Sequence, residues 1–166
     1  GKHEMYEGGV RIPFIVRWPG KVPAGKVNKT SILSGLDYLP TLCHLTGTPY
    51  DKNTVEGDDV ADILLGGDRI PKRFLFWKKQ YPTALHGDWK YHVNRRDGDE
   101  LYRLVSDPNE TTNIIATNPE IAATMLKAIT VWDKSLPPLQ RPVSPSKRKD
   151  GVSPEPKRKT EKDASP

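Results

Sequence analysis

The sequence predicts an α/β protein in which a strand-and-helix segment precedes a small α+β subdomain and a disordered tail. Residues 12–18 form a short apolar run with the length and β-branched content of a buried strand. Residues 74–104 contain short runs in which apolar and polar residues alternate, and residues 118–136 show apolar residues at helical spacing. From residue 141 onward the chain has no aromatic residue and few apolar ones, so it cannot bury enough surface to offset its chain entropy.

A polar loop, residues 1–11, leads directly into the first apolar run. Gly8 and Gly9 allow backbone angles that are closed to other residues, so the loop is able to turn sharply. We expect this turn to bring four polar side chains toward one place: Lys2, His3, Glu7 and Arg11. Glu7 and Arg11 are interpreted as residues that form a structural ion pair or hydrogen-bond the loop, rather than as a catalytic acid and base.

Residues 34–46 predict a helix that covers the strand of residues 12–18. Leucines recur at helical spacing, at positions 36, 39, 42 and 45, and would form its apolar face. Asp37 is the expected N-cap and Gly47 the expected terminator. Cys43 is the only cysteine, which excludes an internal disulfide and a cysteine-based zinc site, and we expect it to be a buried, inert thiol.

The next segment, residues 48–72, is rich in turn-forming and charged residues, and we place a domain boundary near Pro71. Four strands are predicted after it, at residues 74–77, 83–85, 89–94 and 100–104. In the third strand, apolar residues alternate with Lys90, His92 and Asn94, whose side chains we expect to face solvent. The Asp-Gly dipeptide at positions 97 and 98 is the strongest signal for a hairpin turn into the fourth strand.

Asp and Asn side chains in residues 107–113 are able to accept hydrogen bonds from nearby backbone N–H groups, so this segment predicts a side-chain-bonded turn. A helix follows, with Asn118 as its N-cap and Pro119 in its first turn, and it ends before Pro137. Its apolar stripe is assigned to the core: Ile121, Met125, Ala128, Ile129 and Trp132. This helix would lie across three or four antiparallel strands.

Most of the positive charge is in the tail. The chain has a net charge of +5, and residues 141–166 account for +4 of it, with eight basic and four acidic residues. The rest of the chain is nearly neutral, so we do not expect it to bind nucleic acid, and the tail is interpreted as a solvated segment that is able to meet polyanions by charge alone. No run approaches the roughly 18 apolar residues that a membrane helix needs, so no membrane partner is expected.

Several segments resemble those of one enzyme family. Lys2 is followed by the run YEGGVRIP at residues 6–13, and the apolar run ends in RWPG at residues 17–20. The pattern continues in five later segments: 34–42 (SGLDYLPTL), 75–77 (LFW), 87–90 (GDWK), 100–102 (ELY) and 107–113 (DPNETTN). It resembles the C-terminal part of a sulfatase of the arylsulfatase type, in the alkaline-phosphatase-like superfamily, over roughly residues 2–138.

This resemblance implies a site residue and two missing groups. In the family, the lysine of the G-K-x-x-x-Y-E-G-G pattern points at the sulfate ester, so Lys2 would bind sulfate and stabilise charge during S–O cleavage. Family members also use a formylglycine nucleophile, made from a C-x-P-S-R or S-x-P-S-R motif, and a calcium ion held by aspartates and an asparagine. Neither motif nor calcium ligands are recognisable here. Since the sequence also begins with Gly1 inside this loop, we expect a fragment that is inactive alone.

The resemblance also assigns the domains. Residues 1–70 would be the C-terminal end of a large α/β catalytic domain, residues 71–140 a small α+β C-terminal subdomain, and residues 141–166 the disordered basic tail. The substrate of the complete enzyme would be a sulfate ester of a phenol, a sulfated sugar or a polysaccharide, and family members are periplasmic or secreted. His92, Arg95 and Arg96 are candidates for the rim of the substrate cleft.

Two other functions are considered. The chain could be a binding module without catalysis, whose basic tail holds anionic glycans or nucleic acid. It could also be a phosphodiesterase-like relative within the same superfamily. The loop that contains Lys2 and the YEGG run at residues 6–9 favours the sulfatase over the phosphodiesterase.

Overall fold

The computed structural model describes residues 4–138, so Lys2, His3 and the predicted tail of residues 141–166 lie outside the described residues. The chain divides into two units, Gly1–Leu136 and Pro137–Pro166. Every helix and strand described below belongs to the first unit. The division predicted near Pro71 stays a prediction.

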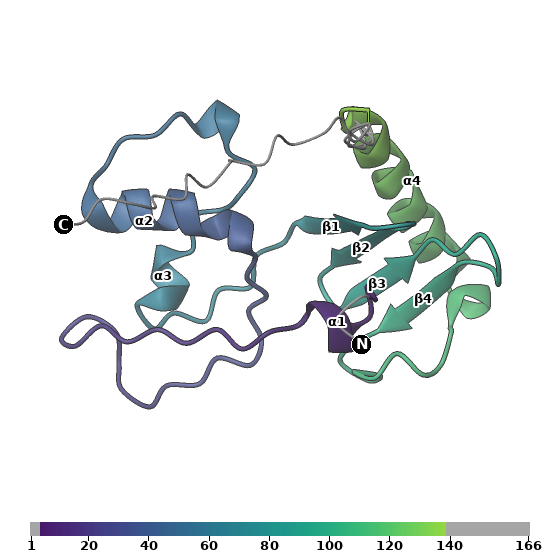
Figure 1. Cartoon of the computed structure of the whole chain (residues 1–166). Coiled ribbons are helices and arrows are strands. Elements are labelled where there is room, and N and C mark those ends of the chain that lie inside the picture. The colour runs from purple at the N-terminus through teal and green to yellow at the C-terminus, as the bar shows by residue number, and fades with distance from the viewer. Residues whose placement is uncertain (1–3, 139–166) are drawn as a thin grey trace, which may run out of the picture. The chain divides into compact units, whose positions relative to one another are not determined.

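Four antiparallel strands form one sheet in the order β1-β2-β3-β4 (Figure 1). They are β1 (Phe74–Lys78), β2 (Pro82–His86), β3 (Trp89–His92) and β4 (Glu100–Arg103). Gly87 and Gly98, in the connections on either side of β3, have φ angles of 60° and 90°, which favour glycine. All four predicted strands are confirmed close to their predicted positions, as is the turn at residues 97 and 98.

One face of the sheet is covered by α4 (Pro119–Ser135), and the core lies between them (Figure 1). The strands and the helix each contribute three buried residues to it: Ala84, Tyr91 and Leu101 from the strands, and Ala122, Met125 and Ile129 from the helix. Trp132 stacks on Phe76 with the two ring centroids 4.9 Å apart. The predicted stripe of α4 is therefore confirmed as the face that packs on the sheet.

The start of α4 differs from the prediction in one detail. Pro119 is its first residue, as expected, but the side chain of Asn118 does not cap the helix. Its amide nitrogen donates to the carbonyl oxygen of Ile114 at 3.0 Å, across the short 3-10 helix η3 (Ile115–Thr117). The side chain thus closes the preceding turn, and the first N–H groups of α4 are left to other partners or to water.

A second helix, α2 (Tyr38–Thr46), follows the 3-10 helix η1 (Gly35–Asp37). Gly47 terminates it with a φ of 68°, as predicted. Cys43 is buried, as predicted, and the other buried residues of the helix are Pro40 and Thr41. The Thr41 hydroxyl accepts the N–H of Val60 at 3.0 Å, just before the short helix α3 (Ala61–Leu64).

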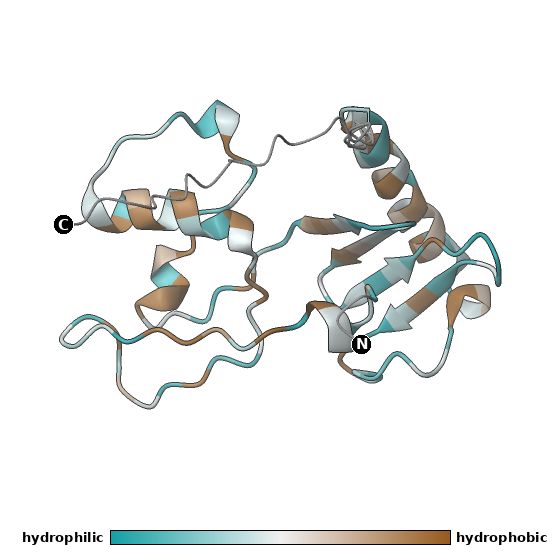
Figure 2. Cartoon of the chain, viewed as in Figure 1, coloured by the Kyte–Doolittle hydropathy of each residue, from teal (hydrophilic) through white to brown (hydrophobic). Residues whose placement is uncertain are grey.

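The predicted apolar face of α2 is wrong. The leucines at positions 36, 39 and 42 are 52%, 54% and 56% exposed. The side of the helix that carries Thr41 and Cys43 is the buried one, because it contacts the segment that leads into α3. Figure 2 shows apolar residues along α2 and along the extended chain before it.

Residues 12–18 do not form the predicted strand. They follow α1 (Glu7–Val10) as an extended segment, and Ile15 is 88% exposed. A strand needs a neighbour with which to exchange backbone hydrogen bonds, and residues 12–17 make no such bond with any described residue. The predicted cover by α2 is also wrong, although Phe14 stacks on Tyr38 with ring centroids 5.6 Å apart. The remaining element is the 3-10 helix η2 (Lys52–Thr54).

Candidate functional site

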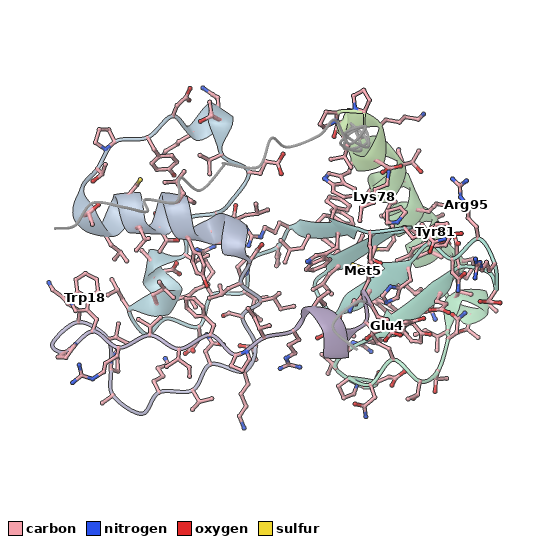
Figure 3. The ribbon with its side chains drawn as sticks, viewed as in Figure 1. Glu4, Met5, Trp18, Lys78, Tyr81 and Arg95 are labelled. Carbon is pink, nitrogen blue, oxygen red and sulfur yellow. The ribbon has the colours of Figure 1, made fainter. Side chains whose placement is uncertain are left out.

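The second face of the sheet carries Lys90 and His92, which point away from α4. Their alternation with Tyr91 is as predicted, but the expectation that they face solvent is wrong: Lys90 is 0% and His92 5% exposed. Residues 4–10, including α1, contribute the contacts on this face through Tyr6 and Glu7. In the view of Figure 3, the labelled side chains of Glu4 and Met5 are drawn in front of or behind the sheet. The loop that follows Lys2 is therefore docked on β3 and β4.

Lys90 is the centre of a buried ionic network. Its Nζ donates to Glu7 Oε1 at 2.9 Å and lies 3.0 Å from Glu110 Oε1. The side chains of Lys90 and Glu110 are 0% and 1% exposed, whereas that of Glu7 is 16% exposed. A buried charge is costly unless it is paired and hydrogen-bonded. Lys90 satisfies this condition with one carboxylate from the loop and one from the segment after β4.

Glu110 accepts hydrogen bonds from three different residues. One oxygen accepts from Lys90 and from His92 Nε2, which is 2.8 Å away, and the other accepts from the backbone N–H of Glu7. Burial raises the pKa of this carboxyl, but the bonds from His92, the Glu7 N–H and Lys90 outweigh burial and hold the pKa below its ordinary value. Glu110 is thus an ionised acceptor at neutral pH, which is the form that the network requires.

The turn that presents Glu110 was predicted from the sequence, and it is confirmed. The Asp107 carboxylate accepts the N–H groups of Thr111 and Thr112 at 2.9 Å each, and the Glu110 N–H bonds to the Asp107 carbonyl at 3.2 Å. These backbone bonds lower the pKa of Asp107. Glu110 itself has a φ of 55°, a left-handed conformation that non-glycine residues rarely adopt. The turn therefore has a defined shape that places Glu110 against Lys90 and His92, on the face of the sheet opposite α4.

Tyr6 contacts both His92 and β4 at the edge of this network. Its ring lies over that of His92 with centroids 4.5 Å apart, and its hydroxyl donates to Glu100 Oε2 at 2.6 Å. Burial and the neighbouring Glu100 raise the pKa of Tyr6. Tyr102 also lies beside the His92 ring, and the same two causes raise its pKa to about 12. Both phenols stay protonated at neutral pH. His92 is further held by the Thr83 hydroxyl, 2.9 Å from its Nδ1.

A second ion pair connects the segment before α2 to the start of the sheet. Arg73 bonds both oxygens of Asp37, at 2.6 and 2.5 Å, and also lies 3.2 Å from the Asp58 carboxylate. Asp37 in addition accepts the N–H groups of Ser34 at 2.7 Å and Asp58 at 3.0 Å. With every carboxylate oxygen occupied by the protein itself, Asp37 has a structural role.

The structure tests only some of the residues predicted for the site. Lys2 and His3 lie outside the described residues, so their predicted positions stay predictions. Of the two structural roles predicted for Glu7 and Arg11, the ion pair between them is wrong, because the Glu7 carboxylate bonds Lys90, a residue 83 positions away, and Arg11 is exposed. Arg95, with the adjacent Arg96, is exposed in the β3–β4 connection, and Figure 3 shows it pointing away from the sheet.

The described part of the chain offers no calcium site. Among residues 4–138 there is no group of three or more His, Cys, Asp or Glu side chains that could hold a metal ion. The carboxylates of Glu7 and Glu110 are occupied by Lys90 and His92, so these residues do not fit a bound calcium. Among the same residues, no helix has the length and apolar character needed to span a membrane.

The family model and the known proteins that this chain resembles are all sulfatases. Residues 1–131 match the family model described as N-sulphoglucosamine sulphohydrolase, C-terminal. Human arylsulfatase A is 40% identical over 87 residues, which are 52% of this chain and 17% of that protein. A sulfatase of Formosa agariphila is 30% identical over 156 residues, or 79% of this chain and 28% of that protein.

A solved structure from work on the metabolism of multiple glycosaminoglycans by Bacteroides thetaiotaomicron has a similar fold. It aligns with a TM-score of 0.67 and 27% identity, over 81% of this chain and 31% of that one. The chain thus spans between 17% and 31% of the length of these relatives. The sheet and helices described above are those of a sulfatase C-terminal region.

Proposed function

Because the chain belongs to the family of sulfatases defined by the N-sulphoglucosamine sulphohydrolase C-terminal model, we propose that it forms the C-terminal portion of an enzyme that hydrolyses sulfate esters. The relatives are named as arylsulfatase and sulfatase, and the similar solved structure comes from glycosaminoglycan metabolism. We therefore propose an aryl sulfate, a sulfated sugar or a sulfated polysaccharide as the substrate of the complete enzyme.

Lys2 is the residue of this chain that we propose to act on the ester. A sulfate monoester carries one negative charge, which moves toward the leaving oxygen as the S–O bond breaks. An ammonium group held beside that oxygen in a water-poor pocket stabilises the developing charge. Lys2 would hold the sulfate group and provide this stabilisation, without taking or giving a proton.

The docked loop is the observation that carries this proposal. Glu7, in the YEGG run that follows Lys2, is held by two separate contacts: its carboxylate accepts from Lys90 of β3, and its backbone N–H donates to Glu110 in the turn after β4. Such a loop has a defined path rather than a solvated one, which a residue that must meet a substrate requires. The nucleophile and the calcium that the family uses would be supplied by residues outside this chain, so we propose that the 166-residue chain alone does not turn over substrate.

The test compares the complete enzyme with this chain. Each is incubated with a chromogenic aryl sulfate and with a 6-O-sulfated sugar, in the presence of calcium, and product is measured against a heat-denatured control. We expect turnover of at least one ester by the complete enzyme and none by the chain. Turnover by the chain alone would contradict the proposed division of the active site, and an inactive complete enzyme would contradict the proposed function.

A further inference from the structure

Lys90 and Glu110 form an ion pair that the proposed chemistry does not use. Both side chains are buried, and their shared partner is Glu7 in the loop after Lys2. We propose that Lys90 and Glu110 are positioning residues for catalysis: they hold this loop so that the Lys2 ammonium meets the sulfate ester. This inference rests on the proposed function, because it assigns the purpose of the network to Lys2.

The contacts fix the orientation of residue 7 as well as its position. Lys90 Nζ holds the Glu7 carboxylate at 2.9 Å, and Glu110 accepts the Glu7 backbone N–H. Two bonds from separate atoms of one residue restrict rotation of the peptide chain, which a single ion pair would not. The Tyr6 ring adds a third contact from the adjacent residue, against His92 at 4.5 Å between centroids.

The charges make this docking depend on Lys90. With Lys90 present, one cation lies between two carboxylates, those of Glu7 and Glu110. Without it, the two carboxylates face each other in a buried site, and like charges that close are strongly unfavourable. Glu7 is the more exposed of the two and belongs to a loop, whereas Glu110 is also held by His92. We therefore expect the loop to leave the sheet when Lys90 is removed.

Displacement of this loop would act on the reaction through Lys2. A misplacement of about 1 Å of a group in an active site is able to reduce the rate about a hundredfold. We expect this displacement to lower kcat, because the charge that Lys2 stabilises is largest in the transition state. A purely structural role of Lys90 would instead reduce the amount of folded enzyme and leave kcat per folded site unchanged.

The decisive experiment is a double-mutant cycle in the complete enzyme, between Lys90→Met and Lys2→Ala. We expect Lys90→Met to lower kcat per folded site about tenfold or more when Lys2 is present, and less than about twofold in the Lys2→Ala background. Equal losses in the two backgrounds would overturn the inference. An inactive unmodified enzyme would overturn the proposed function and this inference with it.

A second measurement uses the 166-residue chain and needs no activity. Amide hydrogen exchange of residues 5–10 reports whether the loop is docked, since protected N–H groups exchange slowly. We expect faster exchange there in Lys90→Met, with little change in α4. Lys78→Met is the matched control, because Lys78 pairs with Asp133 on the α4 side of the sheet. Unchanged exchange at residues 5–10 in Lys90→Met, or the same increase in Lys78→Met, would overturn the inference.

Discussion

Lys90 is buried because of a segment that is distant in the sequence. The alternation of β3 correctly places it on the face opposite Tyr91, and Tyr91 packs on α4. Alternation says only which residues share a face, and it does not say what covers that face. The cover comes from Glu7 and Glu110, and no local pattern connects either of them to β3. The network could therefore not be predicted from periodicity.

Removal of the Lys2 ammonium tests its proposed role. If it stabilises the transition state more than the bound ester, Lys2→Ala in the complete enzyme should lower both kcat and kcat/KM. Loss of one such electrostatic contact typically costs about 2.7 to 4 kcal/mol, or roughly a hundredfold to a thousandfold in rate. Kinetics per folded site and thermal melting on the same preparation separate this from instability. Full activity in a normally folded variant would remove Lys2 from the site.

Glu110 makes the stability of the first unit depend on pH. Its pKa in the folded protein is below the ordinary value of 4.5, so the unfolded chain binds this proton more tightly. The stabilisation is therefore complete above the unfolded-state pKa and is lost as the pH falls through the folded-state pKa. We expect Glu110→Gln to be less stable than the parent at neutral pH, with a difference that shrinks below about pH 4.5.

The measurement is urea unfolding of both proteins from neutral pH to about pH 3. Glu56→Gln serves as the control, because Glu56 is an exposed carboxylate. A stability difference for Glu110→Gln that stays constant over this range would contradict the assignment of Glu110 as an ionised acceptor. Equal pH dependence of the two variants would do the same.

The elements that could be predicted are those specified by local sequence. The hairpin at residues 97 and 98, the end of α2 at Gly47 and the turn held by Asp107 each depend on a few adjacent residues. The segment of residues 12–18 has strand-like composition, but a strand exists only when another strand is beside it. The same applies to the leucine face of α2, whose direction depends on what the helix packs against.

The packing of α4 on the sheet allows a matched test. Ile129 is 2% exposed and lies in the core, whereas Val131 on the same helix is 64% exposed. Ile129→Ala should lower the free energy of unfolding by about 2 to 5 kcal/mol, because it leaves a cavity as well as removing buried surface. Val131→Ala should change it by less than about 0.5 kcal/mol. Similar effects of the two substitutions, measured by urea unfolding, would contradict this packing.

At the scale of the whole molecule, many large apolar side chains of the described residues are exposed. Side chains in residues 12–18 and on the outer side of α2 are exposed, among them Ile12, Ile15, Leu39 and Leu42. Scattered apolar side chains on a surface are normal, but large patches mark contacts with another protein surface. The chain spans at most 31% of the length of the relatives described above. If the chain is one portion of a longer enzyme, as proposed, the rest of that enzyme would cover this surface.

The substitution Leu42→Ser, compared between the 166-residue chain and the complete enzyme, tests whether this surface is covered in the enzyme. In the 166-residue chain Leu42 is 56% exposed, so the substitution should leave the melting temperature nearly unchanged. In the complete enzyme we expect a loss of about 2 to 5 kcal/mol, as for other leucines removed from a core, because the rest of the enzyme would cover this side of α2. Val105→Ser is the control, since Val105 is 77% exposed and lies after β4, away from α2 in the sequence. Equal effects of Leu42→Ser in the chain and in the enzyme would mean that this side of α2 faces solvent in both.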